Sequence, residues 1–182
     1  EISLAKENMF YDWQKEIIVT AGSIEGITAA VLAISQPGDE IILPSPTYAS
    51  HKEVINLAGC TPVFVPLNEN QGWTLELDKF TKAITAKTKA ILFCNPNNPT
   101  GTIYSREQLI GLAELAKKHG LFIISDEVYK DFVYSSSGKI FSLAELPELR
   151  TRVIRTFSFS KSYAMTGWRV GFIHSDESVI KE

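Results

Sequence analysis

Short, continuously apolar runs rich in β-branched residues, separated by segments with helical spacing, constrain the fold of this chain most strongly. The runs are too short for helices, and their composition is typical of strands. We expect these strands at residues 16–20, 40–43, 62–65, 90–94, 121–125, 152–157 and 168–174. Helices are expected after Gly22, over residues 48–58 and 77–84, and from a capping box at residues 105–108 to Gly120.

Apolar strands that alternate with helices favour an α/β fold with a mainly parallel sheet and helices on both faces. One domain is expected, because a chain of 182 residues buries roughly 70% of the surface that its unfolded form exposes. Residues 1–15 are interpreted as a partly helical lead-in, and residues 134–139 as a surface loop rich in Ser and Gly. Sheets of this kind place their binding sites at the carboxyl ends of the strands.

The charge balance argues against some classes of partner. With 18 Lys and Arg against 21 Asp and Glu, the net charge of -3 favours neither nucleic acid nor a membrane surface. No apolar run approaches the ~20 residues that a membrane-spanning helix needs. Cys60 and Cys94 lie beside β-branched or aromatic residues, which is typical of buried thiols in a reducing, cytoplasmic compartment. The chain starts at Glu1 rather than at a methionine, so we expect it to be a fragment.

Polar clusters follow the expected strands, each at the point where a strand ends. They lie at residues 22–23, 46–48, 95–101, 126–129 and 158–161. Because the carboxyl ends of parallel strands meet at one rim of a sheet, we expect these clusters to converge. Three histidines far apart in the sequence make a poor ligand set, so no metal is expected.

The segment Gly22-Ser23-Ile24 turns an expected strand into a helix. Free backbone N–H groups and the positive end of the helix dipole would hold a phosphate there, with Ser158 and Arg169 as further donors. The alternative is that Gly22 only makes a turn, since helix N-termini are more common than bound phosphates. The sequence of this segment alone does not decide between the two.

Lys161 lies in a turn among hydroxyl-bearing and aromatic residues. Packed beside Phe159 and Tyr163, its amine would lose water and become a nucleophile that forms a Schiff base. The alternative is an ordinary lysine in a surface loop.

Asp126 follows an apolar strand, so its carboxylate is expected to be partly buried and to need a cationic or proton-donating partner. A protonated heteroaromatic nitrogen or a basic side chain would serve, and the alternative is a cap of the next turn. His51 is interpreted as a structural histidine or as the residue that orients Asp126. Tyr48 is either part of the core or a ring that stacks on a planar ligand.

Three motifs in this order carry a resemblance: Asn95 to Gly101 (NPNNPTG), Ser125 to Tyr129 (SDEVY), and Ser158 to Lys161 (SFSK) followed by Arg169 in GWRVG. The chain resembles the fold-type I, class I/II pyridoxal-phosphate aminotransferases over nearly its whole length. The resemblance implies a seven-stranded, mostly parallel sheet with helices on both faces and one antiparallel strand. It also implies that residues 1–182 are the large, cofactor-binding domain, without the N-terminal segment and the small C-terminal domain of the family.

The resemblance implies roles for individual residues towards pyridoxal 5'-phosphate. Lys161 would carry the cofactor as a Schiff base and move the substrate proton, and Asp126 would pair with the pyridinium nitrogen. Tyr129 and Asn98 would bind the phenolic oxygen, and Tyr48 would stack on the ring. The phosphate would be held by Gly22, Ser23, Ile24, Ser158 and Arg169. Cis peptide bonds are implied at Ser45-Pro46 and Asn98-Pro99.

By the same resemblance the function is transamination between an amino acid and a 2-oxo acid, in a cytoplasmic homodimer. The 182-residue chain by itself is expected to show little or no turnover. Relatives that prefer aspartate tend to have a lysine where this chain has Ile24, so aromatic, alanine-like or broad neutral amino donors stay open. Two alternatives remain: a β- or γ-eliminating lyase with the same cofactor pocket, and a non-catalytic module that binds the cofactor.

Overall fold

A computed structural model of the chain describes residues 2–5, 7, 9–134 and 139–182. Residues 135–138 of the expected surface loop lie outside these, as do three residues of the lead-in. The lead-in contains one short helix, α1 (Ile2–Ala5), and its residues from 9 onward form loops and turns up to the first strand.

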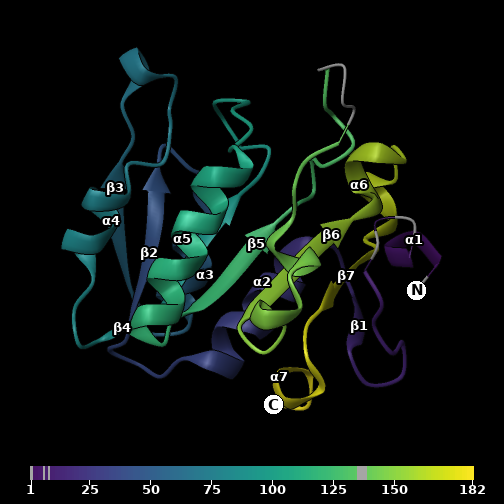
Figure 1. Cartoon of the computed structure of the whole chain (residues 1–182). Helices are drawn as coiled ribbons and strands as arrows, with labels where there is room; N and C mark the ends of the chain where they lie inside the picture. Colours follow the sequence, from purple (N-terminus) through teal and green to yellow (C-terminus); the bar gives the residue numbers. More distant parts are fainter. Residues whose placement is uncertain (1, 6, 8, 135–138) are drawn as a thin grey trace.

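One seven-stranded sheet forms the centre of the molecule, as Figure 1 shows, and its strand order is β1-β7-β6-β5-β4-β2-β3. The strands are β1 (Ile17–Thr20), β2 (Glu40–Ser45), β3 (Thr61–Pro66), β4 (Thr88–Cys94), β5 (Phe122–Asp126), β6 (Val153–Ser158) and β7 (Gly171–His174). Strand β7 runs antiparallel to both of its neighbours, and the pairs from β6 through β3 are parallel. The predicted mostly parallel sheet of seven strands is therefore confirmed.

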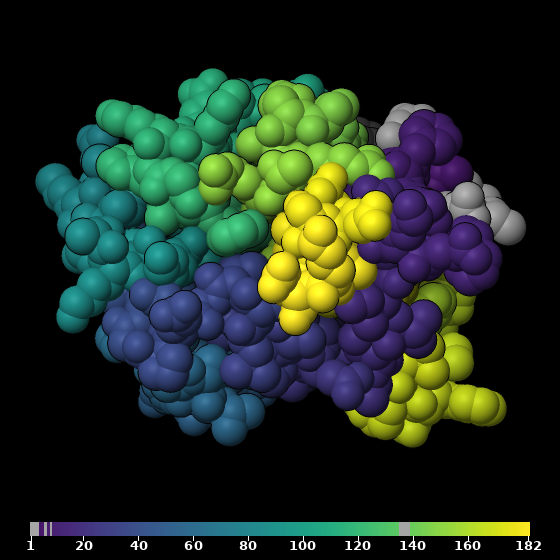
Figure 2. Space-filling model, turned by 90° about the horizontal axis from the view of Figure 1, so that it is seen from below, coloured from purple at the N-terminus to yellow at the C-terminus, as the bar shows by residue number. Residues whose placement is uncertain are grey.

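Helices cover the sheet on both faces (Figure 1). They are α2 (Ser23–Ile34), α3 (Ala49–Leu57), α4 (Leu77–Ala83), α5 (Arg106–His119), α6 (Phe159–Ser162) and α7 (Glu177–Ile180). Helices α2 and α3 bury apolar side chains in one core, and α4 and α5 bury theirs in a second core across the sheet. The C-terminal α7 lies between the first residues of the chain and the α2–β2 region, as Figure 2 shows from below.

The period of two along the strands explains why there are two cores. In β4, Ala90 and Leu92 pack towards α2 and α3, whereas Ile91 and Phe93 pack towards α5. Successive side chains of a strand point to opposite faces, so a strand buried on both sides is apolar throughout. This is why the strands read as continuous apolar runs in the sequence.

The best-defined helix boundaries follow the predicted capping rules. The Ser105 side chain accepts a hydrogen bond from the Gln108 backbone, and the Gln108 side chain accepts one from the Ser105 backbone, which completes the capping box of α5. Gly120 ends this helix in the left-handed conformation, at φ 69°. Both features were expected from the sequence and are confirmed.

The prediction of a strand over residues 168–174 was wrong in its first half. Residues 166–168 form a single 3-10 turn, Arg169 adopts φ 51°, and the strand begins only at Gly171. The side chain of Arg169 donates to the carbonyl oxygens of Thr166 and Ala21, and these contacts favour the turn over an extended chain. The apolar composition of Trp168 and Val170 had suggested a strand where the tertiary contacts select a turn.

Candidate active site

A cleft of about 270 Å³ opens at the carboxyl ends of the strands. Its lining includes Lys161 of α6, and Figure 1 shows α6 at the end of the sheet opposite to α7 and the C-terminus. Every cofactor residue expected from the sequence lines it except Gly22, which lies next to it through Arg169. The lining residues are Ser23, Ile24, Tyr48, Cys94, Asn98, Asp126, Val128, Tyr129, Ser158, Ser160, Lys161, Thr166 and Arg169.

The N-terminus of α2 forms one end of the cleft. Its N-cap residue, Gly22, has φ 82°, and no side chain caps the first turn. A Cβ atom at Gly22 would lie 2.3 Å from Nη2 of Arg169, so only glycine lets the guanidinium lie against this turn. The uncapped N–H groups and the helix dipole favour a bound anion at this end.

Arg169 brings a positive charge to the same end of the cleft. Its Nη1 donates to the Thr166 carbonyl oxygen at 3.0 Å and to Ser160 Oγ at 3.4 Å, and its Nη2 donates to the Ala21 carbonyl oxygen at 3.3 Å. These acceptors are all neutral oxygens, so the contacts orient the guanidinium without neutralising it. A planar guanidinium with this freedom suits a phosphate or a carboxylate.

Two serines at the end of β6 extend the donor set. Ser158 Oγ lies 2.9 Å from Ser160 Oγ and accepts from the Ser160 backbone N–H at 3.1 Å. Both side chains are buried and line the cleft. Ser160 was quoted within the SFSK motif but was not predicted as a site residue, although its spacing from Ser158 was the available signal.

Asp126 is 2% exposed, and both of its carboxylate oxygens have a partner. Oδ2 lies 3.1 Å from Nε2 of His51, and Oδ1 accepts from the Val128 N–H at 3.2 Å. On the other side of the imidazole, Thr47 Oγ1 lies 3.3 Å from Nδ1 of His51. His51 is buried, as expected of a structural histidine, and it makes the hydrogen bond to Asp126 that the alternative role, orienting this carboxylate, requires. Their bond ties the end of β5 to α3, in which His51 is completely buried.

Lys161 lies on α6 and is exposed, so the interpretation of a desolvated amine packed beside Phe159 and Tyr163 is wrong, and the alternative of a lysine at the surface holds. The Phe159 ring packs instead on Phe157 and Phe172, and the Tyr163 ring contacts Phe159. Lys161 Nζ lies 5.9 Å from the ring centroid of Tyr129, and both residues line the cleft. The amine is thus accessible to a ligand rather than enclosed by aromatic rings.

Tyr129 and Cys94 also line the cleft, and both side chains have a raised pKa. Burial raises the pKa of the Tyr129 phenol, and Cys94 and Asp126 raise it further. Burial, followed by the charge of Asp126, raises the pKa of the Cys94 thiol well above its usual value. Both groups therefore remain protonated at neutral pH, the phenol as a hydrogen-bond donor and the thiol as a small, unreactive side chain.

Proline-rich loops carry Tyr48 and Asn98 to the rim. Cis peptide bonds occur at Ser45-Pro46 and Asn98-Pro99, as expected, and at Asn95-Pro96, where none was expected. The Asn97 side chain donates to the Pro46 carbonyl oxygen at 3.3 Å and so joins the two loops.

Within the described part of the chain, no cluster of three or more His, Cys, Asp or Glu is placed to hold a metal. No helix formed by those residues is long and apolar enough to cross a membrane.

Comparison with known proteins gives a consistent family. A sequence profile described as "Aminotransferase class I and II" matches residues 3–182. The aspartate aminotransferase of Sulfolobus acidocaldarius is 39% identical over 170 residues, which are 92% of this chain and 42% of that protein. The aromatic-amino-acid aminotransferase 2 of Thermococcus litoralis is 37% identical over 171 residues, covering 94% of this chain and 44% of that protein.

Solved structures agree with this result. The aromatic aminotransferase from Pyrococcus horikoshii superposes with a TM-score of 0.95 at 34% sequence identity, over 99% of this chain and 48% of that one. The chain thus spans less than half the length of the relatives that it matches. Sequence and fold together show that the chain belongs to the class I and II aminotransferase family.

Proposed function

We propose that residues 1–182 are the cofactor-binding domain of a pyridoxal-phosphate-dependent aminotransferase, which transfers an amino group between an amino acid and a 2-oxo acid. One observation carries the proposal: a single cleft is lined by an accessible amine, a buried carboxylate and an anion site, namely Lys161, Asp126 and the α2 N-terminus with Arg169. These three groups match the aldehyde, the ring nitrogen and the phosphate of one flat cofactor.

The phosphate end of the cofactor fits the residues that are present. The backbone of Ser23 and Ile24 starts a twelve-residue helix without a side-chain cap, and Arg169 lies beside it. The hydroxyls of Ser23 and Ser158 add neutral donors. A dianionic phosphate needs such a set of cationic and neutral donors, and a helix N-terminus supplies the remainder.

The ring also fits. Asp126 is a buried carboxylate, and among the described residues His51 is its only basic ion-pair partner, so a protonated ring nitrogen would complete its environment. Asn98 and the protonated phenol of Tyr129 are the donors for the phenolic oxygen, and Tyr48 is the aromatic side chain for the ring face. When bound, the protonated ring supplies an electron sink for the charge that develops on the substrate α-carbon.

Lys161 has two tasks in this proposal. Its Nζ would hold the cofactor, and with a substrate bound the same amine would take the proton from the substrate α-carbon. Its exposure in the described chain supports the second task, since the amine must reach a substrate that enters from solvent. Burial raises the pKa of the Tyr129 phenol, so it stays protonated at neutral pH and would donate a hydrogen bond to the phenolic oxygen of the cofactor.

We propose further that the enzyme is a homodimer and acts in a reducing, cytoplasmic compartment. Tyr163 and Trp168 lie close in the sequence to the cleft residues Lys161 and Arg169, and their side chains are 58% and 74% exposed in the single chain. Exposed aromatic side chains of this size support a subunit interface beside the cleft. The two cysteines are both free and buried, which supports the reducing compartment.

A titration with pyridoxal 5'-phosphate tests the function. We expect a saturable visible absorbance band in the unsubstituted chain, its loss in Lys161→Ala, and its retention in the control Lys52→Ala on α3. Repeated turnover is not expected of this chain by itself, but amino acids in excess should change the band through a single half-reaction, whose product should be a 2-oxo acid without release of ammonia. A band that survives Lys161→Ala, or ammonia release in place of amino transfer, would contradict the proposal.

A further inference from the structure

Glu127 and Arg155 form a completely buried ion pair that the proposed reaction does not use. Each side chain is 1% exposed, and Arg155 Nε donates to Glu127 Oε2. The second oxygen of Glu127 accepts from Ser125 Oγ at 3.0 Å and from Ser142 Oγ at 2.6 Å. Both oxygens of this carboxylate therefore have hydrogen-bond partners.

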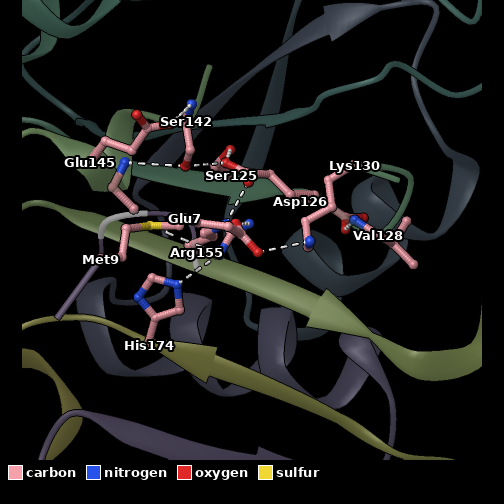
Figure 3. Close-up of polar contacts among 12 residues, drawn as sticks. Glu7, Met9, Ser125, Asp126, Val128, Lys130, Ser142, Glu145, Arg155 and His174 are labelled. Carbon is pink, nitrogen blue, oxygen red and sulfur yellow. Dashed lines mark hydrogen bonds and ion pairs between the residues drawn. The ribbon is translucent and has the colours of Figure 1, made fainter. Parts of the chain in front are cut away.

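The remaining nitrogens of Arg155 are held as well. Nη2 donates to Glu7 at 2.7 Å, and Nη1 lies 3.3 Å from Nε2 of His174 and 3.9 Å from the sulfur of Met9. Figure 3 shows Glu7, Met9 and His174 gathered around the Arg155 side chain. Burial and the charge of Arg155 hold the pKa of His174 well below its usual value. The imidazole is therefore neutral, and its Nε2 can accept a hydrogen bond from Nη1 of Arg155.

This network lies across β5 from the cofactor cleft. Asp126 points towards α3, where it meets His51, whereas Glu127 points towards Ser142 and Arg155 on the side of the sheet covered by α5. The backbone of Glu127 still continues the sheet, because its N–H donates to the Thr156 carbonyl oxygen at 3.0 Å. Fixing the Glu127 side chain therefore fixes the backbone that carries Asp126.

The network also reaches the turn that carries Tyr129. Glu7 pairs with Lys130 at 2.8 Å as well as with Arg155, and the Lys130 N–H donates to the Glu127 carbonyl oxygen at 3.0 Å. Lys130 follows Tyr129 directly, and the N–H of Val128, the residue before Tyr129, donates to the Asp126 carboxylate. Residues 126–130 are thus held from both sides of the sheet.

A buried ion pair contributes little net stability compared with apolar side chains of the same volume, because desolvation offsets its attraction. Its distinctive contribution is to fix the orientation of both side chains, since the two partners and all their hydrogen bonds must be satisfied in one geometry. We propose that Glu127 and Arg155 are positioning residues, which set the orientation of Asp126 and Tyr129 from the side of the sheet opposite the cleft. This inference rests on the proposed function, from which the roles of Asp126 and Tyr129 come.

Amide hydrogen exchange in the cofactor-free chain tests the inference directly. The Val128 N–H donates to the Asp126 carboxylate, so its exchange rate reports on that carboxylate. Arg155→Lys keeps the charge and removes the Nε donor, and we expect exchange at Val128 to become at least about tenfold faster while Leu92 in β4 changes less. The matched control is Arg150→Lys, which changes the ion pair with Glu16 and should leave Val128 unaffected.

The loaded protein gives a second readout, the midpoint of the pH titration of its visible absorbance. We expect Arg155→Lys to move this midpoint by at least about 0.5 pH units, because the carboxylate opposite the ring nitrogen is displaced. A purely structural role would lower stability or occupancy and leave the midpoint where it is. Arg150→Lys again serves as the control.

The proposal is overturned if exchange at Val128 rises only as much as at Leu92, or if Arg150→Lys has the same effect as Arg155→Lys. Should Arg155→Lys fail to fold, Glu127→Gln is measured in the same way, since it keeps the shape and removes the charge. An unchanged Val128 in that variant would also overturn it. Failure of the unsubstituted chain to bind pyridoxal 5'-phosphate contradicts the proposed function instead, because the exchange experiment contains no cofactor.

Discussion

At the scale of single residues, the orientation of Asp126 is the feature on which the proposed chemistry depends most. Its carboxylate accepts from a ring nitrogen of His51 and from a backbone N–H, and neither partner carries the permanent charge of an arginine or a lysine. Such hydrogen bonds fix direction and leave the negative charge available to a ligand. The buried imidazole is thus better explained as an orienting group than as a catalyst.

Replacing His51 by leucine should lower the free energy of unfolding by about 1–3 kcal/mol, because one buried oxygen of Asp126 loses its partner. Urea denaturation measures the change. The same replacement at His119, exposed in the last turn of α5, is the control and should have the smaller effect. Equal effects at the two positions would show that the bond to Asp126 contributes nothing specific.

The lowered pKa of the buried His174 predicts how the stability of the fold depends on pH. Burial and the neighbouring Arg155 hold its folded-state pKa well below the ordinary value of 6.5. Below that value the unfolded chain binds a proton that the folded chain does not, so stability falls as the pH drops, and the slope from this group approaches ~1.4 kcal/mol per pH unit.

Urea denaturation between pH 7.5 and pH 5 measures that slope. We expect His174→Gln, which keeps an acceptor for Arg155, to flatten the curve in this range, whereas His119→Gln should leave it unchanged. A wild-type curve that is already flat below the ordinary histidine pKa, or one that His174→Gln does not alter, would contradict the neutral, buried imidazole.

At the scale of elements, the N-terminus of α2 and Arg169 form one unit. Gly22 at φ 82° leaves space for the guanidinium, which a Cβ atom would occupy. Gly38 also has a positive φ, 92°, but a Cβ atom there would meet nothing within 4 Å. The two glycines therefore separate the effect of backbone conformation from the effect of displacing Arg169.

Both Gly22→Ala and Gly38→Ala should lower stability by about 1–2 kcal/mol, since alanine is strained in the left-handed region. Only Gly22→Ala should weaken the binding of pyridoxal 5'-phosphate, by at least about tenfold, because the phosphate loses the oriented guanidinium. Equilibrium titration followed by absorbance measures the affinity. If Gly38→Ala weakens binding equally, Gly22 acts through stability alone.

At the same scale, the elements that the sequence predicted best are those whose signals are local. The strands and the capping box of α5 were predicted because burial on both faces and the cap at Ser105 are encoded within a few residues. The turn at Arg169 was not predicted, because it depends on a contact with Ala21, 148 residues away. For Lys161 the sequence left a buried amine and a surface lysine both open, because the packing of Phe159 depends on Phe172 in β7. The apolar composition around Arg169 suggested a strand.

At the scale of the whole molecule, the parallel strands bring together residues that are far apart in the sequence. Ser23, Asn98, Asp126 and Lys161 come from four separate segments and line one cleft. Their convergence was predictable from the rule that sites lie at the carboxyl ends of the strands. The ion network around Arg155 was not, since Glu7 and Arg155 are 148 residues apart and neither belongs to a recognisable motif.

The central claim, that this cleft binds the cofactor through Lys161, is tested most directly by reduction and peptide mapping. The chain is mixed with pyridoxal 5'-phosphate, reduced with borohydride and digested, and the labelled lysine is identified by mass spectrometry. We expect the label on Lys161 at one equivalent or less of cofactor, with other lysines labelled only in excess. A label distributed over surface lysines, with Lys161 unmodified, would contradict the account.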